Sequence, residues 1–131
     1  KMPYRSRDMR VLLIGFFGLA GTLARYGLQG AVQRFSGSTF PYGTLAVNVI
    51  GSFLVGLLAA VTLERVMVSA NLRAAVLIGF CGGFTTYSAF AWETLVLARD
   101  GNPIGAIANI AAQVVLGLAA VWAGYTVAIK F

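Results

Sequence analysis

Residues 79–93 read GFCGGFTTYSAFAWE and lie within an apolar stretch, residues 74–98, that is long enough to cross a membrane. Two adjacent glycines followed by two β-branched threonines form a poor helix centre, because each glycine costs about 1 kcal/mol relative to alanine. We therefore expect a helix that breaks near residues 82–86 and leaves half-helices at 74–81 and 88–98. Irregular backbone is tolerated at membrane depth only where it is buried in protein or lines a watery cavity. Close glycine packing without an ion is the alternative interpretation.

Two further apolar stretches precede this one in the chain, and one follows it. The four stretches are residues 11–33, 44–63, 74–98 and 104–129. About 20 apolar residues at 1.5 Å rise cross the roughly 30 Å hydrocarbon core of a bilayer, and the remaining residues are too few for a second soluble domain. The sequence therefore predicts an all-α integral membrane protein. We expect a single domain of four transmembrane helices, placed as a multi-pass protein in the cell (inner or plasma) membrane.

The composition, 59% apolar and 11% charged, excludes several classes of protein. One cysteine and no histidine exclude a disulfide scaffold, a Cys/His metal site and a histidine-dependent nucleophile within one chain. Glu93 alone among the four acidic residues lies in an apolar stretch, so no carboxylate pair is available and we expect no enzyme. The net charge of +6 suits anionic lipid headgroups or an anionic solute, and no basic stripe favours nucleic acid.

The basic residues are distributed unequally along the four-span arrangement. The basic start before the first apolar stretch resembles a secretory signal, but the stretch continues past any small-residue cleavage point and three more follow. The side that holds both termini carries Lys1, Arg5, Arg7, Arg10, Arg65, Arg73 and Lys130. The other side carries Arg34 and Arg99. Taken alone, this difference predicts a cytoplasmic N-terminus.

Thr44, Asn48 and Ser52 recur every four residues and so share one face of the second predicted helix. Hydrogen bonds between helices, worth about 0.6 to 2 kcal/mol each, explain Thr44 and Ser52. Asn48 brings two donors and an acceptor to the middle of the helix, so a neighbour, water or a solute must satisfy it.

The third and fourth stretches contain further polar and aromatic candidates. Tyr87 and Phe90 lie three residues apart on one face, which favours packing, although the electropositive ring edges can also face an anion. Asn109 and Gln113 lie four residues apart, and their amides suit a pathway that coordinates an anion with neutral groups.

Arg25 lies about 21 Å along the first predicted helix from its start, within the bilayer or just short of its far face. A buried arginine costs about 2.5 to 3.5 kcal/mol on insertion scales, which favours a cavity or a partner. Snorkelling of the side chain to the interface is the equally weighted alternative.

Three segments together resemble the Fluc, or CrcB-type, fluoride channel family. They are residues 18–26 (GLAGTLARY), residues 43–53 (GTLAVNVIGSF) and residues 79–93. The similarity covers essentially the whole chain after the N-terminal segment, and the third motif is very specific. The resemblance implies an antiparallel, dual-topology homodimer in the lipid bilayer with two fluoride pathways, passive conduction and a structural sodium ion at the dimer centre.

The resemblance also assigns roles by position. The backbone carbonyls of Gly82 and Thr85 from each chain are expected to hold the sodium ion. The expected pathway residues are the hydrogen-bond donor Asn48, the aromatic pair Tyr87 and Phe90, Ser88 on a polar track, and Arg25 at a vestibule. Glu93 lies on a motif position to which the resemblance assigns no role, and whether it lines the pore stays open.

The chain departs from the family pattern at three places. Tyr87 stands where phenylalanine is usual, and its hydroxyl could donate to the anion or narrow the path. Ala89 stands where threonine is common and removes a polar-track hydroxyl. Asn109, Gln113 and Gly117 replace the hydroxyl or aromatic residues often found on the fourth helix, which leaves open whether they line the pore.

The leading functional hypothesis is thus a fluoride-selective channel for passive fluoride efflux. The alternative is a small proton-coupled multidrug-type exporter, but those proteins carry an essential glutamate in the first helix, where this chain has Arg25. A subunit with a purely structural role in an assembly would explain glycine packing, but it would not explain a broken helix combined with Asn48.

Overall fold

The computed structural model describes residues 4–65 and 68–131. Its elements are α1 (Tyr4–Ser36), α2 (Tyr42–Ala60), η1 (Val61–Arg65), α3 (Ala70–Ala74), η2 (Ala75–Cys81), α4 (Gly82–Phe84), α5 (Tyr87–Arg99) and α6 (Pro103–Lys130), where η marks a π-helical segment. These residues contain no strand and four helical spans long and apolar enough to cross a membrane. The predicted all-α membrane fold is confirmed, and the protein is a multi-pass membrane protein. Lys1, counted above among the basic residues, lies outside the described residues.

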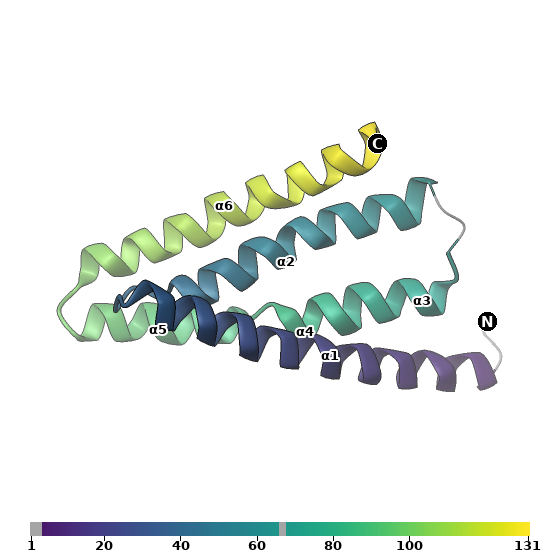
Figure 1. The fold of residues 1–131 in the computed structure, drawn as a ribbon, viewed down its shortest axis with the longest axis horizontal. Coiled ribbons are helices and arrows are strands. Elements are labelled where there is room, and N and C mark those ends of the chain that lie inside the picture. Colours follow the sequence, from purple (N-terminus) through teal and green to yellow (C-terminus); the bar gives the residue numbers. More distant parts are fainter. Residues whose placement is uncertain (1–3, 66–67) are drawn as a thin grey trace.

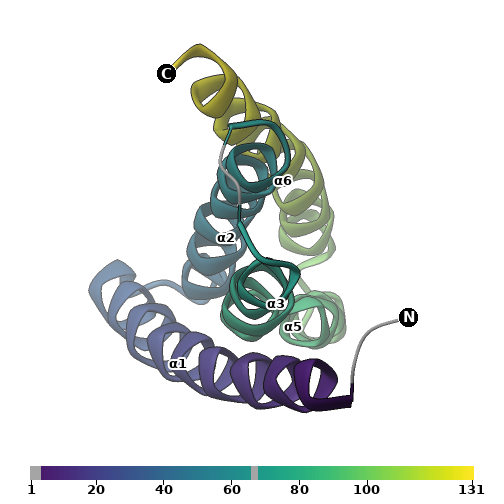
Figure 2. The same cartoon turned by 90° about the vertical axis from the view of Figure 1, so that its right-hand side faces the viewer.

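The four spans lie side by side in an order that differs from their order in the chain (Figure 1). α1 and α6 lie on opposite sides, with α2 and the third span, α3 through α5, between them. The end view of Figure 2 shows the same order, with α1 lowest and α6 uppermost. The first half of the third span packs on α1, α5 packs on α6, and α2 packs mainly on α6.

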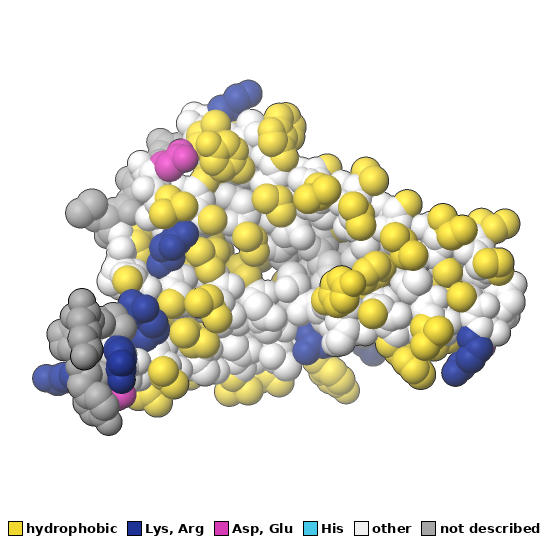
Figure 3. All heavy atoms as spheres, turned by 180° about the vertical axis from the view of Figure 1, so that it is seen from behind, with side chains coloured by type: hydrophobic (Ala, Val, Ile, Leu, Met, Phe, Trp, Pro, Cys, Tyr) yellow, Lys and Arg dark blue, Asp and Glu magenta, His cyan; other side chains and the backbone are white. Residues whose placement is uncertain are grey.

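The outer surface is strongly apolar. Figure 3 shows hydrophobic side chains along the whole length of one face, whereas Lys and Arg side chains gather mainly at one end. Large side chains such as Phe16, Leu19 and Leu118 are exposed in the middle of the spans. An apolar surface of this extent suits lipid or another protein chain rather than water.

Glycines bring the third span into backbone contact with α1. A Cβ atom added at Gly79 would lie 2.8 Å from the carbonyl oxygen of Ile14, and one added at Gly83 would lie 2.6 Å from that of Gly18. Real Cβ atoms do not approach backbone so closely, so the two helices can pack at this distance only with glycine at these positions. Small residues serve membrane helices in this way because close approach maximises van der Waals contact.

The predicted break in the third span is confirmed, but it lies at the threonines rather than at the glycines. Gly82 retains helical dihedrals, with φ −63° and ψ −37°. Thr85 (φ −99°, ψ 158°) and Thr86 (φ −147°, ψ 113°) are extended. The first half-helix therefore continues to Phe84, beyond the predicted end at residue 81. Glycine lowers the stability of a packed helix only modestly, whereas two extended residues end the series of helical hydrogen bonds.

The connection between α1 and α2 determines where α2 begins. Gln33 spans this connection: its Nε2 donates to the carbonyl of Phe40 at 3.0 Å, and its Oε1 accepts from the N–H of Gly43 at 2.9 Å. Gly37 permits the turn with a φ of +61°, a conformation that glycine adopts without strain. The first turn of α2 is thereby tied to α1, which places Asn48 at the level of the break.

Candidate functional site

Asn48 of α2 pairs with the irregular backbone of the third span. Its Oδ1 accepts from the N–H of Thr86 at 2.8 Å, and its Nδ2 donates to the carbonyl of the same residue at 3.0 Å. Nδ2 also donates to Oε1 of Gln113 on α6 at 3.0 Å. The amide of Asn48 therefore satisfies both backbone groups of one extended residue, which would otherwise be left unpaired at membrane depth.

Two backbone carbonyls at the break lack the N–H donors that they would have in an uninterrupted helix. In an uninterrupted helix, the N–H of Thr86 would bond to the carbonyl of Gly82, and the N–H of Ala89 would bond to that of Thr85. Here the first N–H donates to Asn48 and the second donates to the Thr86 hydroxyl at 3.1 Å. The carbonyls of Gly82 and Thr85 thus lose their usual helical donors, and Gly82 is exposed at the surface of the chain.

Arg25 contributes a cationic group to the break. Its Nε donates to the carbonyl of Gly83 at 2.9 Å, and the residue is half-buried. The structure therefore gives Arg25 a partner inside the protein, so the alternative of snorkelling to the interface does not hold. The guanidinium satisfies a third carbonyl whose helical donor the break has removed.

A groove of about 350 Å³ lies beside the break between α2, α5 and α6. Five polar residues and two aromatic residues line it together with three valines, and none of these residues is charged. They are Asn48, Ser52, Thr85, Thr86, Gln113, Tyr87, Phe90, Val55, Val114 and Val121. The groove brings together six of the residues singled out from the sequence: Asn48, Ser52, Thr85, Tyr87, Phe90 and Gln113.

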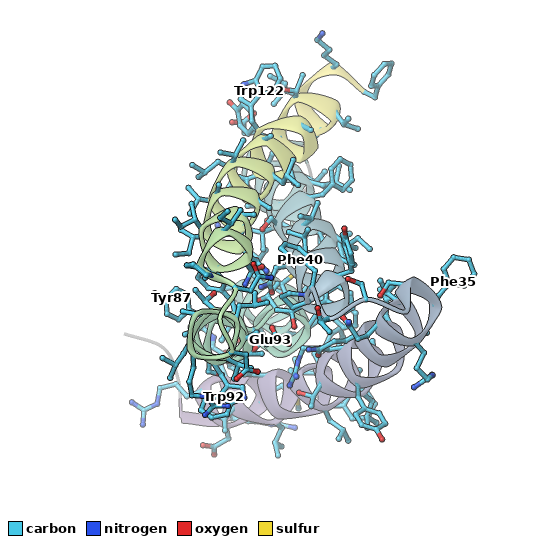
Figure 4. The ribbon with its side chains drawn as sticks, turned by 90° about the vertical axis from the view of Figure 1, so that its left-hand side faces the viewer. Phe35, Phe40, Tyr87, Trp92, Glu93 and Trp122 are labelled. Atoms are coloured by element: carbon cyan, nitrogen blue, oxygen red, sulfur yellow. The ribbon has the colours of Figure 1, made fainter. Side chains whose placement is uncertain are left out.

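The two aromatic rings of the groove pack edge to face. The ring centroids of Tyr87 and Phe90 are 5.5 Å apart, and their planes meet at 73°. Tyr87 is 79% exposed, so its ring stands at the open side of the groove rather than in the bundle interior. Figure 4 shows Tyr87 on the outer side of α5, with Glu93 on the side that faces the other helices.

A second cavity, of about 290 Å³, lies on the other side of α5 and contains Glu93. Gln29 donates to the Thr44 hydroxyl at 2.8 Å, and that hydroxyl donates to Oε2 of Glu93 at 2.9 Å. Oε1 of Glu93 is buried and has no hydrogen-bond partner within the described chain. Thr44 forms the interhelical hydrogen bond expected of it, and its partner is the acidic residue of the third span.

Asn109 and Ser88 lie outside the groove. Asn109 is fully buried, and its Nδ2 donates to the hydroxyl of Thr94 at 2.9 Å. Ser88 is exposed, and its hydroxyl lies 3.4 Å from that of Thr86. The four-residue spacing of Asn109 and Gln113 therefore does not place both amides on one path, because Asn109 packs against α5 one turn away.

Comparison with known proteins identifies the family. The family model described as CrcB-like protein, Camphor Resistance (CrcB), matches residues 12–125. The chain belongs to the CrcB-like protein family. The matched region of this CrcB family member includes the groove, the break and the Glu93 cavity.

Several curated proteins similar to this CrcB family member carry the name fluoride-specific ion channel FluC. The protein of Geobacter sulfurreducens is 48% identical over 114 residues, which cover 87% of this chain and 92% of the relative. The protein of Geobacter metallireducens is 46% identical, with coverage of 88% and 94%. The protein of Geotalea daltonii is 45% identical, with coverage of 90% and 95%.

Sequence reasoning missed two participants in the site of this CrcB family member. The backbone of Thr86 is the partner of Asn48, and Gln29 donates to the Thr44 hydroxyl, which in turn donates to Glu93. Thr44 and Asn48 lie one helical turn apart on the same face of α2. This spacing is the signal that could have predicted that the two cavities lie next to each other. The identity of the partners depends on how the helices are arranged, which spacing within one helix does not determine.

Proposed function

We propose that this protein is a fluoride-selective channel that lets fluoride leave the cell passively. The observation that carries the proposal is the groove at the break of the third span, where neutral polar groups and aromatic rings line a path without a charged side chain. Relatives named as fluoride-specific ion channels, at 45–48% identity over nearly their full length, support the same assignment. Passive conduction forms no covalent bond and so requires no catalytic residue.

The chemistry of the groove favours a small anion. A charge-assisted hydrogen bond contributes about 1.5 to 3 kcal/mol, and a small anion approaches its donors more closely than a large one. The electropositive edges of Tyr87 and Phe90 add attraction without the tight hold that a cationic side chain would exert. Conduction needs this balance, because an ion that binds too strongly does not leave.

In this proposal the functional unit is an antiparallel homodimer with two pathways. The groove is open on one side in the single chain, and large apolar side chains such as Leu118 and Trp122 stand exposed on α6. A second copy in the opposite orientation would close the groove and cover apolar surface. A two-fold arrangement produces two equivalent pathways because each chain presents the same groove.

A structural sodium ion at the dimer centre belongs to the same proposal. The residues present fit such an ion, because the carbonyls of Gly82 and Thr85 lack the N–H donors of an uninterrupted helix. Carbonyl oxygens suit a hard monovalent cation, and an unpaired carbonyl at membrane depth is costly. These two carbonyls from each chain would hold the ion, which would join the two copies without taking part in fluoride movement.

The remaining residues take roles around this path. Asn48 hydrogen-bonds to Thr86 and Gln113 in the wall of the groove. Arg25 lies at the vestibule, where its guanidinium donates to the Gly83 carbonyl at the break. Ser88 lies on the exposed side of α5, at a position that a second chain can approach. Glu93 lines its own cavity beside the groove and is not among the groove-lining residues.

Efflux from proteoliposomes tests the proposal. Vesicles loaded with fluoride, with chloride or with an organic cation should release fluoride far faster than the other two. Equal release of chloride and fluoride would remove fluoride selectivity, and proton-dependent release of the organic cation would replace the channel with an exporter.

Accessibility labelling tests the dual topology. A cysteine placed at Leu72, which is exposed at the start of the third span, should react with a membrane-impermeant reagent from both sides of the membrane. The native Cys81 is buried and is replaced by alanine in the same experiment. Labelling from one side alone would rule out the antiparallel dimer while leaving fluoride conduction to the efflux assay.

A further inference from the structure

The orientation of the Gln113 amide is determined by a chain of hydrogen bonds that begins at the backbone. The N–H and carbonyl of Thr86 bond to Oδ1 and Nδ2 of Asn48, so the oxygen and nitrogen of that side chain cannot exchange places. The second hydrogen on Nδ2 then requires an acceptor, and Oε1 of Gln113 provides it at 3.0 Å. Turning the Gln113 amide over would place two donors face to face.

This arrangement leaves Nε2 of Gln113 without a partner. The atom is buried, and no hydrogen-bond acceptor for it is present among residues 4–65 and 68–131. Both hydrogens of Asn48 Nδ2 are already engaged, by Thr86 and by Gln113. Of the two side-chain amides that line the groove, only that of Gln113 therefore has N–H groups to offer. A buried donor without an acceptor is costly, which makes an acceptor at this position favourable.

We propose that Gln113 donates the hydrogen bond that holds the anion in the groove, and that Asn48 is a positioning residue for Gln113. This inference rests on the proposed fluoride function and names the donor in this chain. A fluoride ion beside Nε2 accepts the N–H that the protein leaves unpaired, and the aromatic residues Tyr87 and Phe90 line the same groove. The other polar residues of the groove carry hydroxyls or, in Asn48, an amide already in use.

Two substitutions of Gln113 separate donation to the anion from support of Asn48. Gln113→Met keeps the length of the side chain and removes both donor and acceptor. Gln113→Glu, ionised at mildly alkaline pH, keeps an acceptor for Asn48 but has no donor. The matched control is Val115→Met, because Val115 is a neighbour on α6 that is exposed on the outer surface and does not line the groove.

The assay measures initial fluoride efflux over a series of fluoride concentrations, with the full-length protein purified in detergent and reconstituted in liposomes. We expect both Gln113 variants to lose about tenfold or more of the flux, as expected for one charge-assisted hydrogen bond. Val115→Met should stay within about twofold of the unsubstituted protein. Size-exclusion profiles and melting temperatures identify any variant that has lost its fold.

The possible results separate three claims: donation by Gln113 to the anion, support of Asn48 by Gln113, and fluoride conduction by the protein. Full flux in Gln113→Met overturns the inference while the fluoride function stands. Lost flux in Gln113→Met with full flux in Gln113→Glu assigns Gln113 to the support of Asn48 and overturns its role as donor. An unsubstituted protein that does not conduct fluoride removes the proposed function, and the inference is then rejected with it. If Gln113→Met does not fold, Gln113→Glu alone decides, because full flux in that variant contradicts donation.

Discussion

The two halves of the third span differ in how closely they pack on the neighbouring helices. The first half, α3 through α4, lies against α1 in backbone contact through Gly79 and Gly83, with no room for a Cβ atom at either position. The second half, α5, packs against α6 and has a cavity on each side. The same span therefore packs tightly on α1 with its first half and lines polar cavities with its second half.

The break between the halves is what allows this difference. An uninterrupted helix would have no backbone groups to offer, because each N–H would bond to a carbonyl four residues earlier. At the extended Thr86, the backbone instead bonds to Asn48, which in turn bonds to Gln113. The polar wall of the groove therefore depends on two residues that leave the helix.

The largest expected effect is a loss of stability when the glycine contact between α1 and the first half of the third span is disrupted. Gly83→Val should prevent stable folding, because even its Cβ atom would lie 2.6 Å from the Gly18 carbonyl and overpacking of this kind costs about 1 to 3 kcal/mol or more. The matched control is Gly27→Val, since a Cβ atom there meets nothing within 4 Å. Expression level and melting temperature in detergent measure the effect. A stable Gly83→Val protein would contradict the close packing of the first half.

The next effect concerns the groove beside the second half. Asn48→Asp should abolish fluoride efflux while the protein still folds, because an ionised carboxylate cannot donate to the Thr86 carbonyl or to Gln113. Ser52→Ala is the control, since Ser52 lines the same groove without a role in that chain of bonds, and its flux should stay within about twofold. Normal flux through Asn48→Asp would make this residue a packing element only.

A moderate loss of flux and of dimer stability is expected for a substitution at Gly82. This substitution separates contacts within one chain from contacts between two chains. A Cβ atom at Gly82 would meet only the Leu77 carbonyl, at 4.0 Å, so Gly82→Val should fold as a single chain. In the proposed dimer it would crowd the carbonyls that hold sodium, and dimer stability and flux should both fall. Replacing sodium by a large organic cation should act on the unsubstituted protein in the same direction. A fully dimeric and active Gly82→Val protein would argue against the central cation.

The smallest effect is expected for Thr85→Ser. The proposed sodium ligand at this residue is its backbone carbonyl, and serine keeps the hydroxyl that donates to the Cys81 carbonyl at 3.0 Å. Loss of one methyl group beside Gly51 should cost about 0.5 to 1.5 kcal/mol. Efflux and dimer content should therefore remain close to those of the unsubstituted protein, and a large loss would indicate that the methyl packing, rather than the carbonyl, matters at this position.

The sequence predicted the four spans and the broken third helix because these follow from apolar length and from local residue preferences. The observed break at Thr85 and Thr86 lies within the predicted residues 82–86. The first half-helix ends three residues later than predicted, because Gly82 and Gly83 remain helical where this half packs against α1. The pairing of Asn48 with Thr86 could not be predicted, because it depends on the height at which α2 meets the third span. Spacing alone likewise grouped Asn109 with Gln113, although the two amides face different neighbours in the bundle.

The groove beside the break is the proposed path of fluoride. It is tested most directly by blocking that groove chemically in a Cys81→Ala background, with one cysteine at Val114, which lines the groove, or at Val115, which does not. Fluoride efflux from liposomes is measured before and after a small thiol reagent, and mass spectrometry verifies that both cysteines have reacted. We predict that the reagent stops efflux through the Val114→Cys protein and leaves efflux through the Val115→Cys protein unchanged. Undiminished efflux through fully modified Val114→Cys would contradict the proposed path, because fluoride would then cross by another route.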